Sequence, residues 1–303
     1  MSKKSPRFYT LISIGAALAT IALKAGAYFL TGSVGLLSDA AESCVNLVAA
    51  LVAFWAVSYA AKPPDEKHPY GHFKAEYFSS GVEGALILVA AITIAVAAWD
   101  RLLYPQELEE IGIGLALSLV ASIINGIVAI VLLRAGKSLR SITLKADGHH
   151  LLTDVWTSVG VVIALIAVPV TGWLILDPLI AFVVAINIVW AGIKLLHETG
   201  DGILDTGLPK EEQQVINNIL TKYDNQNIQF HALRTRVAGA RRFVSFHVLV
   251  PGEWTVKQGH ALCEEIELAI IKALPGTYVF THLEPVEDPT SWNDQNLDRT
   301  VSN

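Results

Sequence analysis

The sequence has little charge and few cysteines, and each shortage excludes a class of protein. Only 17% of the 303 residues are charged, whereas a soluble domain carries about a quarter. The two cysteines, Cys44 and Cys263, are too few for a disulfide framework or a zinc-finger ligand set. The formal net charge of −6 is the opposite of the basic excess that phosphate binding requires, so we expect no nucleic-acid partner.

Apolar residues are abundant and unevenly distributed along the chain. They make up 52% of the sequence and give it a mean hydropathy of +0.47. Charged residues are sparse before about residue 200 and frequent after it. We therefore predict a transmembrane domain at 1–200, a water-exposed domain at 201–288 and a polar, disordered tail at 289–303.

The first domain contains segments long enough to cross a lipid bilayer, which takes roughly 20 apolar residues. Six segments meet this length: Phe8–Leu30, Val34–Ala60, Phe78–Trp99, Ile111–Leu133, Ser141–Val168 and Trp173–Leu195. Their short connections predict an all-α, up-and-down six-helix bundle. Basic residues gather in the loops at 61–74 and 134–145. The positive-inside rule then predicts a multi-pass protein of the cell's inner membrane with both termini in the cytoplasm.

The second domain has the pattern of a small α+β fold. Two stretches have helical periodicity, Lys210–Tyr223 and Val256–Leu274. Three stretches alternate as strands do, Phe230–Val237, Arg242–Val250 and Tyr278–Leu283, and a turn at 238–240 separates the first two. The order αββαβ predicts a three-stranded sheet backed by two helices.

Polar residues inside the spans are expensive to bury in lipid and are usually functional. Glu42 and Asn46 of the second span are four residues apart, as are His150 and Asp154 of the fifth, so each pair shares one helix face. At about 1.5 Å of rise per residue, Asn46 and Asp154 fall at overlapping depths. Four such donors from two helices can bind one ion tetrahedrally, as zinc prefers. The alternative is that they only join the helices by hydrogen bonds.

Other polar residues of the spans have weaker patterns. Asp39 precedes Glu42 by three residues, can share its face and is the substitute for it. His149 points about 100° away from His150 around the helix, so we do not expect it to be a ligand. We interpret three residues that lack a partner at helical spacing as packing or water-cavity contacts: Lys24, Glu83 and Asn125.

A second candidate cluster lies in the loop after the second span. Asp65, His68 and His72 fall within eight residues, and one carboxylate with two imidazoles can close on one metal ion. The alternative is a solvated loop that contains histidines by coincidence.

A third candidate cluster lies in the C-terminal domain, which holds four of the nine histidines. The donors are His231, His247, His260, His282 and Glu284. Because the three predicted strands are neighbours in one sheet, these side chains can converge on one or two cations. The alternative is a set of scattered surface histidines.

Three motifs carry a resemblance to a known family. They are His150-x-x-x-Asp154, Asp65-x-x-His68-Pro69-Tyr70-Gly71-His72-x-Lys74-x-Glu76, and His231-x-Leu233-Arg234-Thr235-Arg236 with the downstream His247, His260 and His282. Together they resemble the cation diffusion facilitators, and most closely their bacterial ferrous-iron and zinc efflux branch. The resemblance covers nearly the whole chain.

The resemblance implies a homodimer of six-helix protomers whose cytoplasmic domains have a metallochaperone-like fold. It also implies that the transported ion binds between the second and fifth spans and is exchanged for protons. The loop and C-terminal clusters would bind further ions that stabilise the dimer and modulate transport, with Glu284 standing where an Asp is usual.

One departure from the family pattern concerns the second span, where that branch normally has two aspartates. Glu42 and Asn46 stand at these positions, and asparagine cannot ionise, so the site has one negative charge fewer. The proton stoichiometry is therefore left open. One histidine with three oxygen ligands permits iron(II) or manganese, and cobalt and cadmium stay open. The Irving–Williams order favours zinc over iron(II) and manganese.

The sequence thus predicts a divalent metal cation/proton antiporter in the lipid bilayer that exports zinc or a similar ion, and not an enzyme. An intramembrane metallohydrolase is disfavoured because the chain has no His-Glu-x-x-His motif. The alternative is a membrane-anchored metal sensor or metal-binding scaffold, for which the C-terminal cluster alone would suffice.

Overall fold

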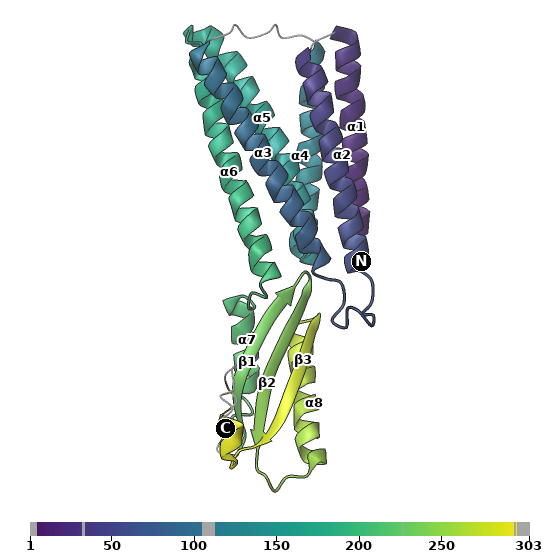
Figure 1. Cartoon of the computed structure of the whole chain (residues 1–303), viewed down its shortest axis with the longest axis vertical. Helices are drawn as coiled ribbons and strands as arrows, with labels where there is room; N and C mark the ends of the chain where they lie inside the picture. Colours follow the sequence, from purple (N-terminus) through teal and green to yellow (C-terminus); the bar gives the residue numbers. More distant parts are fainter. Residues whose placement is uncertain (1–4, 32–33, 105–112, 226, 294, 296–303) are drawn as a thin grey trace. The chain divides into compact units, whose positions relative to one another are not determined.

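The computed structural model describes residues 5–31, 34–104, 113–225, 227–293 and 295 (Figure 1). The chain divides into two compact units, Met1–Asp201 and Gly202–Asn303. Each unit has its own packed interior, so each is described by itself.

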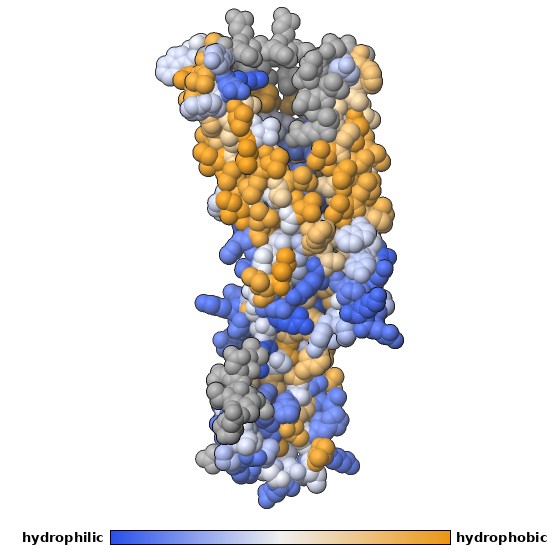
Figure 2. Space-filling view, viewed as in Figure 1, coloured by the Kyte–Doolittle hydropathy of each residue, from blue (hydrophilic) through white to orange (hydrophobic). Residues whose placement is uncertain are grey.

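The first unit is built from six long helices (Figure 1). These are α1 (Pro6–Thr31), α2 (Val34–Ala60), α3 (Ala75–Leu103), α4 (Ile113–Leu139), α5 (Ile142–Thr171) and α6 (Leu176–Ile203). All six are long and apolar enough to cross a membrane. Figure 2 shows apolar residues over much of the visible face of this unit. Val183 and Ile186 of α6, for example, are about two-thirds exposed. The predicted six-helix transmembrane bundle is confirmed.

Small residues let the helices of the bundle approach closely. Helix α1 packs against α2 and α4, and α5 packs against α3 and α4. The buried face of α2 consists largely of alanines: Ala49, Ala50, Ala53, Ala56 and Ala60. A Cβ added to Gly148 of α5 would lie 2.8 Å from Cγ of Leu133 on α4, so a larger residue would push the two helices apart. Close packing therefore fixes the segment of α5 that carries His150.

The start of α5 is held by a buried carboxylate from α3. Ser141 is the N-cap of α5, and its Oγ accepts a hydrogen bond from the N–H of Leu144 at 3.4 Å. Glu76 of α3 accepts hydrogen bonds from the hydroxyl of Ser141 and, at 3.4 Å, from the N–H of Thr143. A carboxylate at a helix N-terminus satisfies backbone donors and is favoured by the helix dipole.

The second unit has the order αββαβ (Figure 1). Its elements are α7 (Lys210–Leu220), β1 (Gln229–Ala238), β2 (Arg241–Val250), α8 (Val256–Ala273), β3 (Thr277–Pro285) and the 3-10 helix η1 (Pro289–Trp292). The sheet order is β1-β2-β3, with β1 antiparallel to β2 and β2 parallel to β3. The predicted α+β fold is confirmed, and the hairpin turn narrows to Gly239 and Ala240.

The core of the second unit forms between the sheet and its two helices. Apolar residues of β2, such as Phe246 and Val248, are buried against Ile216 of α7 and Ile266 of α8. Helix α8 begins at a capping box in which Thr255 and Gln258 each satisfy the other's backbone N–H. These local signals explain why the sequence predicted this domain closely.

The start of the predicted disordered tail is structured. Pro289–Trp292 forms one 3-10 turn, in which Asp288 accepts a hydrogen bond from the N–H of Thr290 at 2.8 Å. The indole N–H of Trp292 donates to the carbonyl of Val286 at 3.0 Å, and Ser291 is buried. The expectation of disorder from residue 289 overlooked this aspartate cap. Residues 296–303 lie outside the described part of the chain.

Candidate metal centres

The first candidate centre lies between α2 and α5 in the bundle. The side-chain amide of Asn46 donates to Oδ2 of Asp154 at 2.6 Å, and its Oδ1 lies 2.8 Å from Nε2 of His150. Because an amide oxygen only accepts hydrogen bonds, Nε2 of His150 is the donor in this arrangement. All three side chains are less than a tenth exposed. The prediction that Asn46 and Asp154 share one depth in the bundle is confirmed.

The fourth predicted donor of this centre is Glu42. Its backbone lies on α2, one helical turn before Asn46. The side chains of Glu42 and of its substitute Asp39 lie outside the part of the chain that the structure describes. The choice between them therefore stays a prediction.

Two residues that the sequence analysis set aside lie against this centre. Asn125 of α4 donates from Nδ2 to Oδ2 of Asp154 at 3.1 Å. Glu83 of α3 places Oε2 3.7 Å from Nδ1 of His150. No titratable residue stands three or four positions from either of them along its own helix, so spacing within one helix did not reveal them. The usable signal was a buried polar residue in an otherwise apolar span.

Helix α5 carries a second acidic residue, Asp147, one turn before His150. Asp147 is 2% exposed and accepts a hydrogen bond from Ser13 of α1 at 3.0 Å. His149, two residues further along, is exposed, as its position around the helix predicted. The buried face of α5 therefore carries Asp147, His150 and Asp154, whereas His149 is on the other face.

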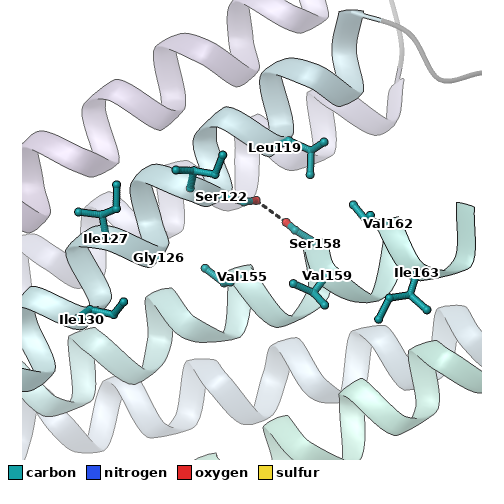
Figure 3. A pocket seen from close by; sticks show the side chains of 11 residues that line it. Leu119, Ser122, Gly126, Ile127, Ile130, Val155, Ser158, Val159, Val162 and Ile163 are labelled. Carbon is teal, nitrogen blue, oxygen red and sulfur yellow. Dashed lines mark hydrogen bonds between the residues drawn. The ribbon is translucent and has the colours of Figure 1, made fainter. Parts of the chain in front are cut away.

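An apolar groove runs beside the centre, between α4 and α5 (Figure 3). It has a volume of about 460 Å³ and is lined mainly by branched aliphatic side chains such as Ile127 and Val159. Figure 3 shows the hydroxyls of Ser122 and Ser158 directed at each other across it. Ser158 also donates to the carbonyl of Asp154 at 2.9 Å. With almost no polar lining, the groove offers nothing to a cation.

The second candidate centre is the loop between α2 and α3. Nδ1 of His68 lies 3.1 Å from Nε2 of His72, and Oδ2 of Asp65 lies 3.2 Å from the same nitrogen. One ligand atom from each of the three residues lies within 4.8 Å of the other two. The backbone N–H of His68 donates to Asp65 at 2.7 Å, and this bond lowers the pKa of the Asp65 carboxyl. The predicted loop residues therefore converge, with an ionised carboxylate among them.

The third candidate centre lies on the sheet of the C-terminal domain. Nε2 of His231 lies 3.0 Å from Nδ1 of His247, and Oε2 of Glu284 lies 3.1 Å from each. The register places His231 opposite His247, and a bulge follows at Ala232, whose φ is 52°. The neighbouring strands thus bring two imidazoles and one carboxylate together, as predicted.

The other two predicted donors of this centre differ from each other. His282 is paired with His247 in the sheet register and lies 3.3 Å from Oε1 of Glu284, with a side chain that is 65% exposed. His260 is exposed on α8 and is not in the trio of ligand atoms that the described residues form. Its neighbours Gly259 and Cys263 occupy the buried face of α8, so His260 points away from the domain core.

Two family models match the chain. The model described as the cation efflux transmembrane domain matches residues 10–204, and that described as the cation efflux protein, cytoplasmic domain, matches residues 208–286. The first match alone covers more than half of the chain.

Individual proteins match over most of their length. The chain is 56% identical over 292 residues to the "Uncharacterized transporter sll1263" of Synechocystis sp., covering 96% of this chain and 94% of that protein. It is 30% identical over 263 residues to the cation-efflux pump FieF of Citrobacter koseri, covering 87% of each.

Among solved structures, the metal-bound C-terminal domain of the CzcD transporter from Thermotoga maritima matches 27% of this chain and 99% of that chain. The match has 23% identity and a TM-score of 0.25. Taken with the bundle, the αββαβ domain and the motif residues, the match of both family models shows that the protein belongs to the cation efflux family, the cation diffusion facilitators.

Proposed function

We propose that this cation efflux transporter exports a divalent metal ion, with zinc favoured, in exchange for protons. The observation that carries the proposal is the buried group of Asn46, His150 and Asp154. The amide nitrogen of Asn46 lies 2.6 Å from Oδ2 of Asp154, and its amide oxygen lies 2.8 Å from Nε2 of His150. An amide oxygen, an imidazole nitrogen and a carboxylate oxygen are ligands for zinc and similar ions. Glu42, one turn before Asn46, would complete a four-ligand set.

Exchange with protons follows from competition for the same lone pairs. A metal ligand must be deprotonated, so binding of the ion releases protons and protons displace the ion. Histidine changes its charge near physiological pH, which suits His150 to this competition. We infer that a movement of helices exposes the site to each side of the membrane in turn, as in other secondary transporters.

The arrangement of the rest of the molecule is proposed from the same pattern. Both termini would lie in the cytoplasm, with 1–200 in the membrane and 201–288 in water as a dimerisation domain. The loop group (Asp65, His68, His72) and the sheet group (His231, His247, Glu284, with His282) would bind further ions there. Binding at these places would stabilise a homodimer and modulate transport.

The choice of zinc over iron(II), manganese, cobalt or cadmium is the finest part of the proposal. Zinc binds mixed nitrogen and oxygen sites more tightly than iron(II) or manganese in the Irving–Williams order. The neutral amide of Asn46 makes the site less negative than a pair of aspartates would. The panel of ions must therefore be compared directly.

The test is uptake by proteoliposomes with an imposed pH gradient and a panel of divalent ions. We expect saturable Zn²⁺ uptake that scales with the gradient and is absent in Asp154→Ala. Uptake that ignores the gradient would overturn the exchange. A wild-type protein that binds Zn²⁺ without any flux would favour the membrane-anchored sensor or scaffold instead.

A further inference from the structure

Glu83 of α3 is the buried acid of the bundle with the fewest partners among the described residues. It is 1% exposed, and neither carboxylate oxygen accepts a hydrogen bond from any described residue. Its ion-pair neighbour is His150, at 3.7 Å. Burying a carboxylate without hydrogen bonds is energetically costly, so its presence indicates a function.

The imidazole of His150 lies between Asn46 and Glu83. Nε2 faces Oδ1 of Asn46 at 2.8 Å, while Nδ1 faces the carboxylate of Glu83. A histidine that binds metal through one nitrogen commonly donates from the other to a carboxylate, which fixes the tautomer and the ring orientation. An ion bound at Nε2 would thus leave Nδ1–H directed at Glu83.

The charge of the site also indicates a role for Glu83. A divalent ion in a low-dielectric interior is stabilised by nearby negative charge. Asn46 contributes none, whereas Glu83 brings a carboxylate to the opposite side of the same imidazole. We propose that Glu83 is the positioning residue of the transport site, which orients His150 and supplies the negative charge that Asn46 lacks. This inference rests on the proposed function.

The experiment compares Zn²⁺ uptake by proteoliposomes of the full chain carrying wild type, Glu83→Gln, Asn46→Asp or both changes. Glu83→Gln keeps the shape and removes the charge. We expect the Zn²⁺ concentration at half-maximal rate to rise about 10- to 100-fold, as for other carboxylates behind a metal-binding histidine. The maximal rate should change less. Adding Asn46→Asp should reverse most of that rise, because it restores a negative charge at the same imidazole.

The matched control is Glu198→Gln on α6. This glutamate is 41% exposed and lies 4.0 Å from Lys145, so the same chemical change should leave the half-maximal concentration unaltered. Thermal unfolding of each variant in detergent checks that the fold is intact.

The outcomes separate the inference from the function on which it rests. An unchanged half-maximal concentration in Glu83→Gln, beside an active wild type, would overturn the inference alone. A rise that Asn46→Asp does not reverse would also overturn it, because a role in packing predicts no rescue by charge. Absence of Zn²⁺ uptake by the wild type would overturn the proposed function and this inference together.

Discussion

The bundle and the C-terminal domain each gather imidazole and carboxylate groups, but different forces hold the two groups in place. In the sheet, His231 and His247 lie opposite each other because backbone hydrogen bonds fix the register of β1 and β2. In the bundle, Asn46 and His150 meet only because the side chains of α2 and α5 pack together. Each of those helices satisfies its own backbone hydrogen bonds.

This difference separates a fixed site from a movable one. Two helices can shift against each other without losing any backbone hydrogen bond, whereas a sheet cannot change its register without breaking its ladder. The bundle group (Asn46, His150 and Asp154) therefore suits an ion that must be released on the other side of the membrane. The sheet group suits an ion that stays bound. The following predictions test this contrast, from the largest expected effect to the smallest.

Removal of a ligand from the bundle group should abolish transport. We expect Asp154→Ala and His150→Ala each to reduce proton-driven flux to background, because each loses a ligand and a proton carrier together. The measurement is the initial rate of Zn²⁺ uptake at a fixed pH gradient. His149→Ala is the matched control, since this exposed neighbour should be dispensable. Normal flux in Asp154→Ala would show that the ion does not pass this group.

The acid of the second span should be distinguishable by the same assay. Glu42→Ala should lose nearly all flux, because Glu42 shares the helix face of Asn46. Asp39→Ala should lose only a part. Strong loss in Asp39→Ala together with full activity in Glu42→Ala would assign the ligand to Asp39.

Removal of a ligand from the sheet group should affect stability more than transport. We expect His231→Ala to lose most of the rise in unfolding temperature that Zn²⁺ gives the wild type, while flux at saturating Zn²⁺ persists. A ligand that binds only the folded state stabilises it by about 2.7 kcal/mol when its free concentration is 100 times the dissociation constant. The measurement is thermal unfolding with and without Zn²⁺.

The control for that variant is His260→Ala on the exposed face of α8. This variant should keep the rise in unfolding temperature that Zn²⁺ gives, because His260 lies outside the trio of His231, His247 and Glu284. Complete loss of flux in His231→Ala would contradict the division between a fixed and a movable site.

The smallest effect concerns the pH dependence of the loop group. The N–H of His68 lowers the pKa of Asp65, so this carboxylate stays ionised as the pH falls through the range in which histidines take up protons. Protonation of Asp65 should therefore not be the cause of metal loss from the loop as the pH falls. Asp65→Asn removes a charged ligand and should weaken Zn²⁺ binding by the loop at every pH at which the carboxylate is ionised. The measurement is a Zn²⁺ titration of the full chain at several pH values, and an unchanged affinity in Asp65→Asn would contradict the prediction.

The sequence alone determined the elements and the pairs within them. Hydropathy over a helix length and strand alternation depend on neighbouring residues, so the six spans and the αββαβ order were predictable. The same holds for Asn46, His150 and Asp154, because spacing of three or four residues fixes which side chains share a helix face.

Only the tertiary structure decided which groups from different elements meet. Glu83 and Asn125 reach the site from α3 and α4, where no second titratable residue at helical spacing marks them, and Ser13 contacts Asp147 across 134 positions of sequence. His260 lies on the exposed face of α8, outside the trio of His231, His247 and Glu284, because α8 turns its apolar face inward. The physical reason is the same in each case: a contact between elements depends on how their surfaces pack, and packing combines distant residues that no local pattern relates.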